Sequence, residues 1–282
     1  MLTDKIRLAG AEATDPEDFL GESLGVIFPD DITNQHGDIE HPVIYLSPKF
    51  GDIVLQLADP QGDDNRKLFS HFLWNSGLQI ADYIEDDEVR DWNVEGMKVL
   101  ELGAGTGLSG IIAARAGADE VVITDYPAPE VLANIKKNVE KNVKSHESST
   151  RAATGRPQCW VQGHEWGDLE DEFCAKHKGT FDIIIVADCL WMPWQHENLM
   201  KSVNHFMKPK GRAWVVAGFH TGRAKMANFF VEETLAKHDL KVDSIMERDP
   251  DGIEREFVFD RGTEDVTVRK RWLVVSVLKH KE

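Results

Sequence analysis

The sequence predicts an α/β fold built on a doubly wound, mostly parallel sheet. From Met97 onward, short apolar runs alternate with helix-patterned stretches. Such alternation implies parallel strands that are covered by helices on both faces of the sheet. Three later strand candidates, Leu240–Met246, Arg255–Asp260 and Arg271–Lys279, follow one another with no helix pattern between them. They predict a closing antiparallel pair at the end of the sheet.

The individual elements of this alternation are short and well separated. The predicted strands are Lys98–Leu102, Glu120–Thr124, Gln158–Gln162, Phe181–Ala187 and Arg212–Gly218. The predicted helices are Leu108–Ala116, Pro129–Val143, Glu197–Phe206 and Ala224–Ala236. The unbroken apolar run from Ile183 to Val186 indicates a central strand, because a half-exposed strand would alternate apolar and polar residues.

Residues 1–70 differ in character and are predicted to form an acidic N-terminal extension before a main domain at 71–282. Met1–Asp38 is acidic and interrupted by prolines and glycines, which predicts irregular structure. Val43–Leu46 and Ile53–Leu57 are β-rich runs on either side of a turn that contains Pro48 and Gly51, so they predict a β-hairpin. A short helix is expected around Leu78–Ile84.

Composition limits the kind of partner. The chain has 282 residues and a formal net charge of −17, from 49 acidic and 32 basic residues. This charge repels phosphates and argues against nucleic-acid binding, whereas it favours a basic protein surface. Simple solubility accounts for the same charge.

Targeting and metal signals are missing from the sequence. No run approaches the roughly 18 apolar residues of a membrane span, and Met1–Gly25 lacks the regions of a secretory signal. We therefore expect a cytoplasmic protein. The three cysteines, Cys159, Cys174 and Cys189, match no zinc-binding spacing, and no metal is expected.

A glycine-rich turn, Glu101-Leu102-Gly103-Ala104-Gly105-Thr106-Gly107, joins the first predicted strand to a helix. Ligands of open α/β sheets bind at this edge, where glycines allow close approach of the backbone. Leu108 interrupts the dinucleotide pattern, which needs a third glycine, and no Gly-Lys-Ser/Thr ending of a P-loop is present. The spacing G-x-G-x-G after an acid favours S-adenosylmethionine, with a ligand-free turn as the alternative. Glu101, Gly103, Gly105 and Gly107 are therefore candidate cofactor residues.

Three side chains are predicted to lie at the same edge of the sheet. Asp125 ends the second strand and faces the glycine turn, where it could accept hydrogen bonds from ribose hydroxyls; helix capping is the alternative. Trp166, in Glu165-Trp166-Gly167-Asp168, could contact an adenine or belong to the core. Asp188 ends the central strand and would point into the cleft, since an unpaired buried carboxylate is costly.

Together these motifs resemble the seven-strand protein methyltransferases of the lysine-directed family sixteen. The resemblance rests on His71–Gly77, Val99–Gly110, Ile123–Asp125, Glu165–Gly167 and Val186–Asp188. It implies a Rossmann-like, seven-stranded class I methyltransferase fold. It also implies cofactor contacts from Trp74, Gly103, Ala104, Gly105, Asp125, Trp166 and Ala187.

The resemblance also implies where the methyl acceptor binds. Asp188 opens the family's D-x-x-Y element, but Trp191 stands where the tyrosine usually lies. That departure puts a role for a hydroxyl in doubt and leaves an aromatic wall for the amine. The acidic N-terminus and Asp188–Trp194 are most similar to fungal members that methylate the N-terminus and an adjacent lysine of translation elongation factor 1-alpha. The implied partner is this basic protein, with Asp188 and Trp191 as catalytic candidates.

Other functions are left open by the sequence. A small-molecule N-methyltransferase, such as one that uses nicotinamide, would carry identical cofactor motifs. A module that binds the cofactor without catalysis is favoured by Trp191, whereas a NAD-dependent dehydrogenase is disfavoured by Leu108. Trp194, His196 and His220 could line the substrate entrance, although ordinary surface or capping roles are favoured for the histidines because nothing pairs them to a nucleophile.

Overall fold

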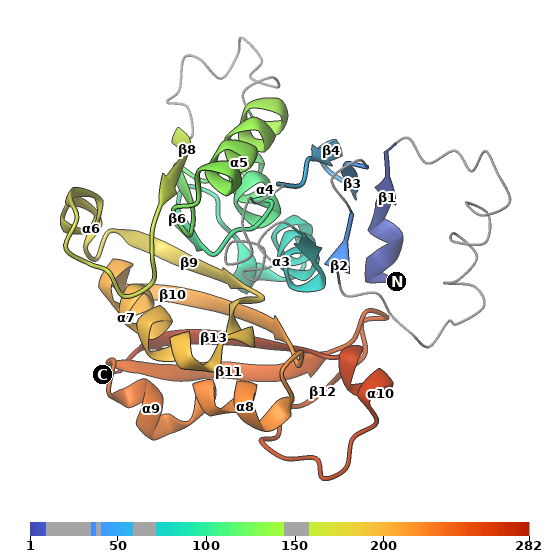
Figure 1. Cartoon of the computed structure of the whole chain (residues 1–282), viewed down its shortest axis with the longest axis vertical. Helices are drawn as coiled ribbons and strands as arrows, with labels where there is room; N and C mark the ends of the chain where they lie inside the picture. Colours follow the sequence, from blue (N-terminus) through green and yellow to red (C-terminus); the bar gives the residue numbers. More distant parts are fainter. Residues whose placement is uncertain (10–34, 38–40, 59–71, 144–157, 282) are drawn as a thin grey trace, which may run out of the picture.

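The computed structural model describes residues 1–9, 35–37, 41–58, 72–143 and 158–281 of the chain. Its centre is an eight-stranded sheet of order β12-β11-β13-β10-β9-β6-β7-β8 (Figure 1). The strands are β6 (Lys98–Leu102), β7 (Glu120–Asp125), β8 (Gln158–Gly163), β9 (Phe181–Ala187), β10 (Met207–Gly218), β11 (Leu240–Arg248), β12 (Glu254–Glu256) and β13 (Leu273–His280). The five strands from β10 to β8 run parallel, whereas β13, β11 and β12 are antiparallel. The predicted parallel sheet with an antiparallel end is confirmed.

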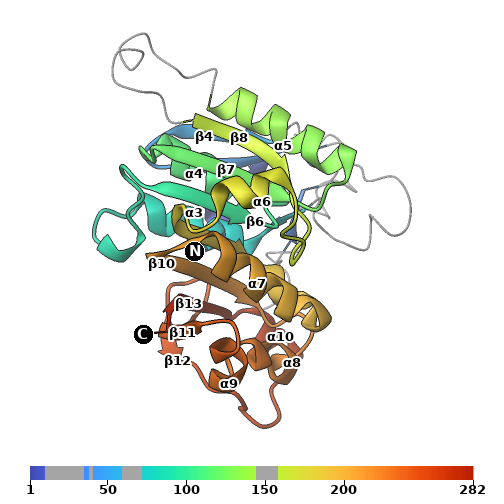
Figure 2. The same cartoon turned by 90° about the vertical axis from the view of Figure 1, so that its left-hand side faces the viewer.

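Helices cover both faces of the sheet. They are α3 (Asn75–Glu85), α4 (Leu108–Arg115), α5 (Pro129–Asn142), α6 (Glu172–His177), α7 (His196–Phe206), α8 (Arg223–Ala227), α9 (Glu232–Ala236) and α10 (Val266–Lys270). Figures 1 and 2 show α3 and α4 on one face and α7 on the other. Side chains of β9 alternate between two cores, Ile183 and Ile185 in one and Ile184 and Val186 in the other. Because both faces are buried, the strand is apolar throughout.

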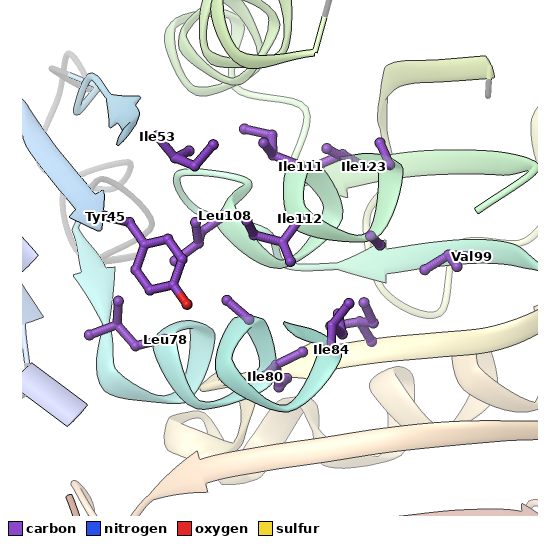
Figure 3. Close-up of a cluster of buried hydrophobic side chains, with 14 of the residues drawn as sticks. Tyr45, Ile53, Leu78, Ile80, Ile84, Val99, Leu108, Ile111, Ile112 and Ile123 are labelled. Atoms are coloured by element: carbon purple, nitrogen blue, oxygen red, sulfur yellow. The ribbon is translucent and has the colours of Figure 1, made fainter. Parts of the chain in front are cut away.

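The predicted N-terminal hairpin is present and belongs to a small sheet. Strands β3 (Val43–Ser47) and β4 (Gly51–Leu55) pair antiparallel, and β1 (Ile6–Leu8) adds a third strand beside β3. A 3-10 helix, η1 (Leu2–Lys5), precedes β1, so the first residues are more regular than predicted. In the core between α3 and α4, Tyr45 and Ile53 of this sheet lie close to Leu78 and Leu108 (Figure 3).

Two asparagines of α5 hydrogen-bond to the backbone of the edge strand β4 and of Gln56, the residue that follows it. Asn138 and Asn142 stand four residues apart, so both lie on one face of the helix. The Asn142 amide accepts from the Val54 N–H at 3.0 Å and donates to the Val54 carbonyl at 2.9 Å. Asn138 makes the same pair of bonds to Gln56, at 2.9 and 3.0 Å, and also donates to the Thr106 carbonyl at 3.0 Å. The small sheet is thereby connected to the glycine-rich turn.

Three local features differ from the sequence-based expectation. The predicted helix Ala224–Ala236 is interrupted at Val231, whose backbone is extended, and forms α8, a 3-10 turn η7 (Asn228–Phe230) and α9. Helices α6 and α10 were missed, although each begins at an aspartate whose side chain accepts from backbone N–H groups of the first turn. Such N-caps were the available signal.

Among the described residues, no helix is both long and apolar enough to cross a membrane.

Candidate active site

A pocket of about 950 Å³, part of it open to solvent, lies at the carboxyl ends of the parallel strands. It brings together the predicted site residues from five separate parts of the sequence. Those that line it are Trp74, Glu101, Gly103, Ala104, Gly105, Asp125, Trp166, Ala187, Asp188 and Trp191. Gly107 is not among the lining residues.

The glycine-rich turn needs glycine for two different reasons. At Gly103, φ is 68°, and a Cβ atom would lie 2.7 Å from the Cys189 sulfur and 2.8 Å from the Trp166 ring. At Gly107, φ is 81°, and the residue starts α4 in the left-handed conformation that other residues rarely adopt. Gly107 therefore turns the chain into the helix, whereas Gly103 leaves room for the Cys189 and Trp166 side chains, which pack closely against the turn.

Glu101 places a carboxyl group beneath the turn. The side chain is buried, and its Oε2 atom accepts a hydrogen bond from the Gly110 N–H at 2.9 Å. A Cβ atom on Gly110 would lie 2.7 Å from that oxygen, so this glycine leaves room for the carboxyl. Burial raises the pKa of Glu101 from 4.5 to about 8. A cation bound beside it would favour the ionised form.

Asp125 stands at the end of β7, directly beside the turn, as predicted. Its two carboxylate oxygens accept from the Gly105 and Tyr126 N–H groups, each at 2.8 Å. Burial raises its pKa from 3.8 to about 6. The N-cap of the following helix is Ala128, so the helix-capping alternative for Asp125 is wrong. Each oxygen retains lone-pair capacity for a further donor.

Aromatic side chains form the walls of the pocket. Trp166 lies against Gly103, lines the pocket and packs partly against the hydrophobic core on the α7 side. Trp74 belongs to β5 (Leu73–Trp74), which pairs with β2 (Gln35–His36) of the N-terminal extension. Trp191 lies in a 3-10 turn, η5 (Cys189–Trp191), with its ring 6.5 Å from that of Trp194. Trp194 is 71% exposed at this end of the pocket.

Asp188 occupies the turn after β9 in a left-handed conformation with φ of 56°. Its N–H donates to the Val216 carbonyl at 2.8 Å, and its Oδ1 accepts from the Gly218 N–H at 3.0 Å. The Nε2 atom of His220 lies 3.0 and 3.1 Å from the two carboxylate oxygens. No sequence signal joined Asp188 to His220, because they lie 32 residues apart on loops after neighbouring strands.

The two candidate histidines differ in their surroundings. Burial lowers the pKa of His196, whose Nε2 bonds to the Leu190 carbonyl at 2.9 Å, so this side chain joins η5 to α7. Burial alone would lower the pKa of His220 too, but the Asp188 carboxylate outweighs burial and raises it. Within the described parts of the chain, no group of His, Cys, Asp and Glu side chains could hold a metal ion.

The doubly wound sheet, the closing antiparallel strands and the glycine-lined pocket define the Rossmann-like class of S-adenosylmethionine-dependent methyltransferases. A solved structure of a candidate methyltransferase of this kind from Streptococcus mutans shares the fold. Its TM-score is 0.52 at 13% identity, over 88% of this chain and 57% of that one. Residues 56–235 match the family model described as lysine methyltransferase, and the chain belongs to that family.

Curated relatives share one printed name, Protein N-terminal and lysine N-methyltransferase EFM7. The protein of Yarrowia lipolytica is 36% identical over 168 residues, which are 57% of this chain and 60% of the relative. The protein of Candida albicans is 27% identical over 251 residues, 87% of this chain and 88% of the relative. The more similar of these two matches thus spans less than two thirds of the relative's length.

Proposed function

We propose that this protein transfers the methyl group of S-adenosylmethionine to the N-terminal amine, or to a nearby lysine, of a protein. Translation elongation factor 1-alpha is the proposed substrate. The observation that carries the proposal is one continuous pocket, in which the glycine turn and Asp125 face the same space as Asp188 and Trp191. The printed names of the relatives support the acceptor class.

The residues of the pocket fit this cofactor. Carboxylate oxygens of Asp125 have capacity to accept from ribose hydroxyls, and the backbone of the glycine turn at Gly103 and Gly105 lines the pocket directly. Trp74 and Trp166 offer flat apolar surfaces for an adenine. Glu101 is suited to the ammonium group of the methionine part, since a cation would lower the pKa of this buried carboxyl.

Bound S-adenosylmethionine supplies a methyl group on a positively charged sulfur. The chain's own contribution is alignment: Asp188 orients the incoming amine, and Trp191 forms a wall beside it. Holding two reactants in line can lower a barrier by about 7–11 kcal/mol. An aromatic face also stabilises a cation by about 0.5–2 kcal/mol, which assists a positively charged amine on its way in.

Further parts of the proposal concern the setting of the reaction. A net charge of −17 complements a basic protein substrate and opposes nucleic acid. We place the reaction in the cytoplasm, where a translation factor is available. Residues 71–282 would form the methyltransferase domain, with 1–70 as its acidic extension. Deleting residues 1–38 should weaken activity on the whole protein substrate more than on a short peptide. The acidic segment would contact basic surface of the folded substrate that a peptide lacks.

One labelling experiment tests the function. Incubate the protein and methyl-labelled S-adenosylmethionine with an extract of cells that lack the gene, and identify the labelled products. The expected result is one labelled protein of elongation-factor size, with label on its N-terminal residue or a nearby lysine. Label only in small molecules such as nicotinamide would contradict the protein substrate. Tight cofactor binding with no labelled product would indicate a binding module.

Asp188→Ala separates chemistry from cofactor binding. We expect this change to abolish labelling while the dissociation constant for S-adenosylmethionine, measured by calorimetry, changes less than threefold. Turnover at the wild-type rate would show that Asp188 is structural only. Glu95→Gln, an exposed acid outside the pocket, serves as the control.

A further inference from the structure

His220 and Asp188 are held together by the backbone of two neighbouring strands. The loop after β9 presents Asp188, and the Gly218 N–H at the end of β10 donates to its Oδ1 atom at 3.0 Å. Gly218 also leaves space for the histidine, because a Cβ atom there would lie 2.6 Å from the His220 Nε2. A side chain at position 218 would displace the ring. The local sequence thus favours this one pairing.

The pair extends from the pocket toward solvent. Asp188 lines the pocket, and its side chain is 5% exposed, whereas that of His220 is 22% exposed. The Trp74 ring, which lines the pocket, lies edge-on to the His220 ring at 4.9 Å. Lys270 of α10 is the other charged group that acts on His220. His220 is therefore the member of the pair from which a proton can reach water.

We propose that His220 is a positioning residue that receives, through Asp188, the proton that the acceptor amine must lose before methylation. This inference rests on the proposed function, because it requires an amine acceptor. A protonated amine has no lone pair, and unperturbed α-amines and lysines have pKa values of about 8 and about 10.4. Some group near the amine must therefore take up a proton in each turnover.

The proton can be followed from atom to atom. An N–H bond of the ammonium group breaks and the proton passes to an Asp188 oxygen, and then to the Nε2 atom of neutral His220, in the tautomer that carries its ring proton on Nδ1. The amine becomes neutral, while Asp188 returns to a carboxylate beside an imidazolium. The amine lone pair then forms the N–C bond as the C–S bond breaks and leaves its electron pair on sulfur. His220 finally releases a proton to water.

The direction of the pH dependence follows from this scheme. Below its pKa, His220 is already protonated and cannot take up another proton, so turnover should fall as the pH drops through that value. The Asp188 carboxylate raises this pKa, and the cationic Lys270 lowers it. General acid–base groups of this kind contribute about 10²- to 10⁴-fold to rates. Loss of His220 should therefore lower kcat within that range.

An NMR titration tests the pairing without any substrate. The His220 ring resonance, assigned by its loss in His220→Asn, should titrate above the ordinary value of 6.5 in the wild-type protein. It should move to a lower pKa in Asp188→Asn, which removes the negative charge and keeps the shape. An identical titration in both proteins would overturn the inference, whether or not the protein methylates anything.

Kinetics on a peptide copy of the elongation factor 1-alpha N-terminus test the proton step. His220→Asn should bind S-adenosylmethionine within threefold of wild type, lose about 10²- to 10⁴-fold in kcat, and lose the acidic limb of the pH–kcat profile. The control is His205→Asn, since the His205 ring bonds to the Cys174 carbonyl at 2.9 Å in the α6–α7 region and does not line the pocket. A wild-type acidic limb in His220→Asn would refute the proton role. A wild-type protein that labels no peptide would refute the proposed function instead. The NMR titration would still test the interaction between Asp188 and His220.

Discussion

Glu101→Gln perturbs the most deeply buried acid of the pocket with little change in shape. The carboxyl is 1% exposed and accepts from the Gly110 N–H at 2.9 Å, which a glutamine oxygen can also do. Burial raises its pKa from 4.5 to about 8 in the folded protein. The unfolded chain, however, releases the proton near 4.5. Ionisation of Glu101 therefore favours unfolding at neutral pH.

The size of the effect follows from the linkage between protonation and folding. Between pH 4.5 and about 8 the folded state keeps a proton that the unfolded state loses, so stability falls as the pH rises. Each pH unit in that window lowers the free energy of unfolding by about 1.4 kcal/mol, which amounts to about 5 kcal/mol in total. Glutamine has no proton to release. The substitution should thus be nearly neutral at pH 5 and stabilising by up to that amount at pH 8.

Urea unfolding at pH 5, 6.5 and 8, followed by circular dichroism, measures this difference. The quantity to compare is the free energy of unfolding of Glu101→Gln minus that of the wild type at each pH. The exposed control Glu95→Gln should give a difference that does not change with pH. A constant difference for Glu101→Gln as well would refute the reasoning, because it would mean that the buried carboxyl ionises as it does in the unfolded chain.

Four further substitutions test other parts of the site. Asp125→Asn should weaken S-adenosylmethionine binding about 10- to 100-fold in calorimetry, since a charged hydrogen bond contributes about 1.5–3 kcal/mol; unchanged binding would exclude the ribose role. Asn142→Ala and Asn138→Ala should each destabilise the protein by about 1–3 kcal/mol in urea unfolding. Only Asn138→Ala should also weaken cofactor binding, because Asn138 donates to the Thr106 carbonyl of the glycine turn and Asn142 does not. Equal effects of the two substitutions on binding would contradict a link between α5 and the turn. Trp191→Tyr, which restores the usual family residue, should keep kcat within about threefold if position 191 acts as an aromatic wall, and a large gain would assign the hydroxyl a role.

The cofactor half of the pocket could be predicted because its determinants are local in sequence. The turn at Gly103–Gly107 follows a strand of recognisable length, and Asp125 lies at the end of the next strand. Parallel pairing of β6 and β7 places Leu102 opposite Thr124, so the residues that follow each strand must meet. Strand order and glycine spacing were sufficient for this part.

The acceptor half could be predicted only in part, because it depends on contacts between distant segments. Asp188 was found from its place at a strand end, but its partner His220 follows β10, and no spacing rule links the two loops. The contacts of the α5 asparagines could not be predicted either, since their partners are backbone groups of Val54 in β4 and of Gln56 just after it. The sequence pattern of a helix shows which of its residues are polar, but not which backbone groups elsewhere in the chain they bind.

The N-terminal part of the chain contacts both halves of the pocket. Trp74 lies in β5, where it lines the pocket and contacts the His220 ring at 4.9 Å, and β5 is itself paired with β2. Gln56, the residue after β4, connects through Asn138 to the Thr106 carbonyl in the glycine turn. Both connections run from residues before position 75 to groups that shape the pocket. Residues of the N-terminal part therefore stabilise both sides of the pocket. Gln56 supports the glycine turn through Asn138, and β2 supports the Asp188–His220 pair through its pairing with β5, which carries Trp74.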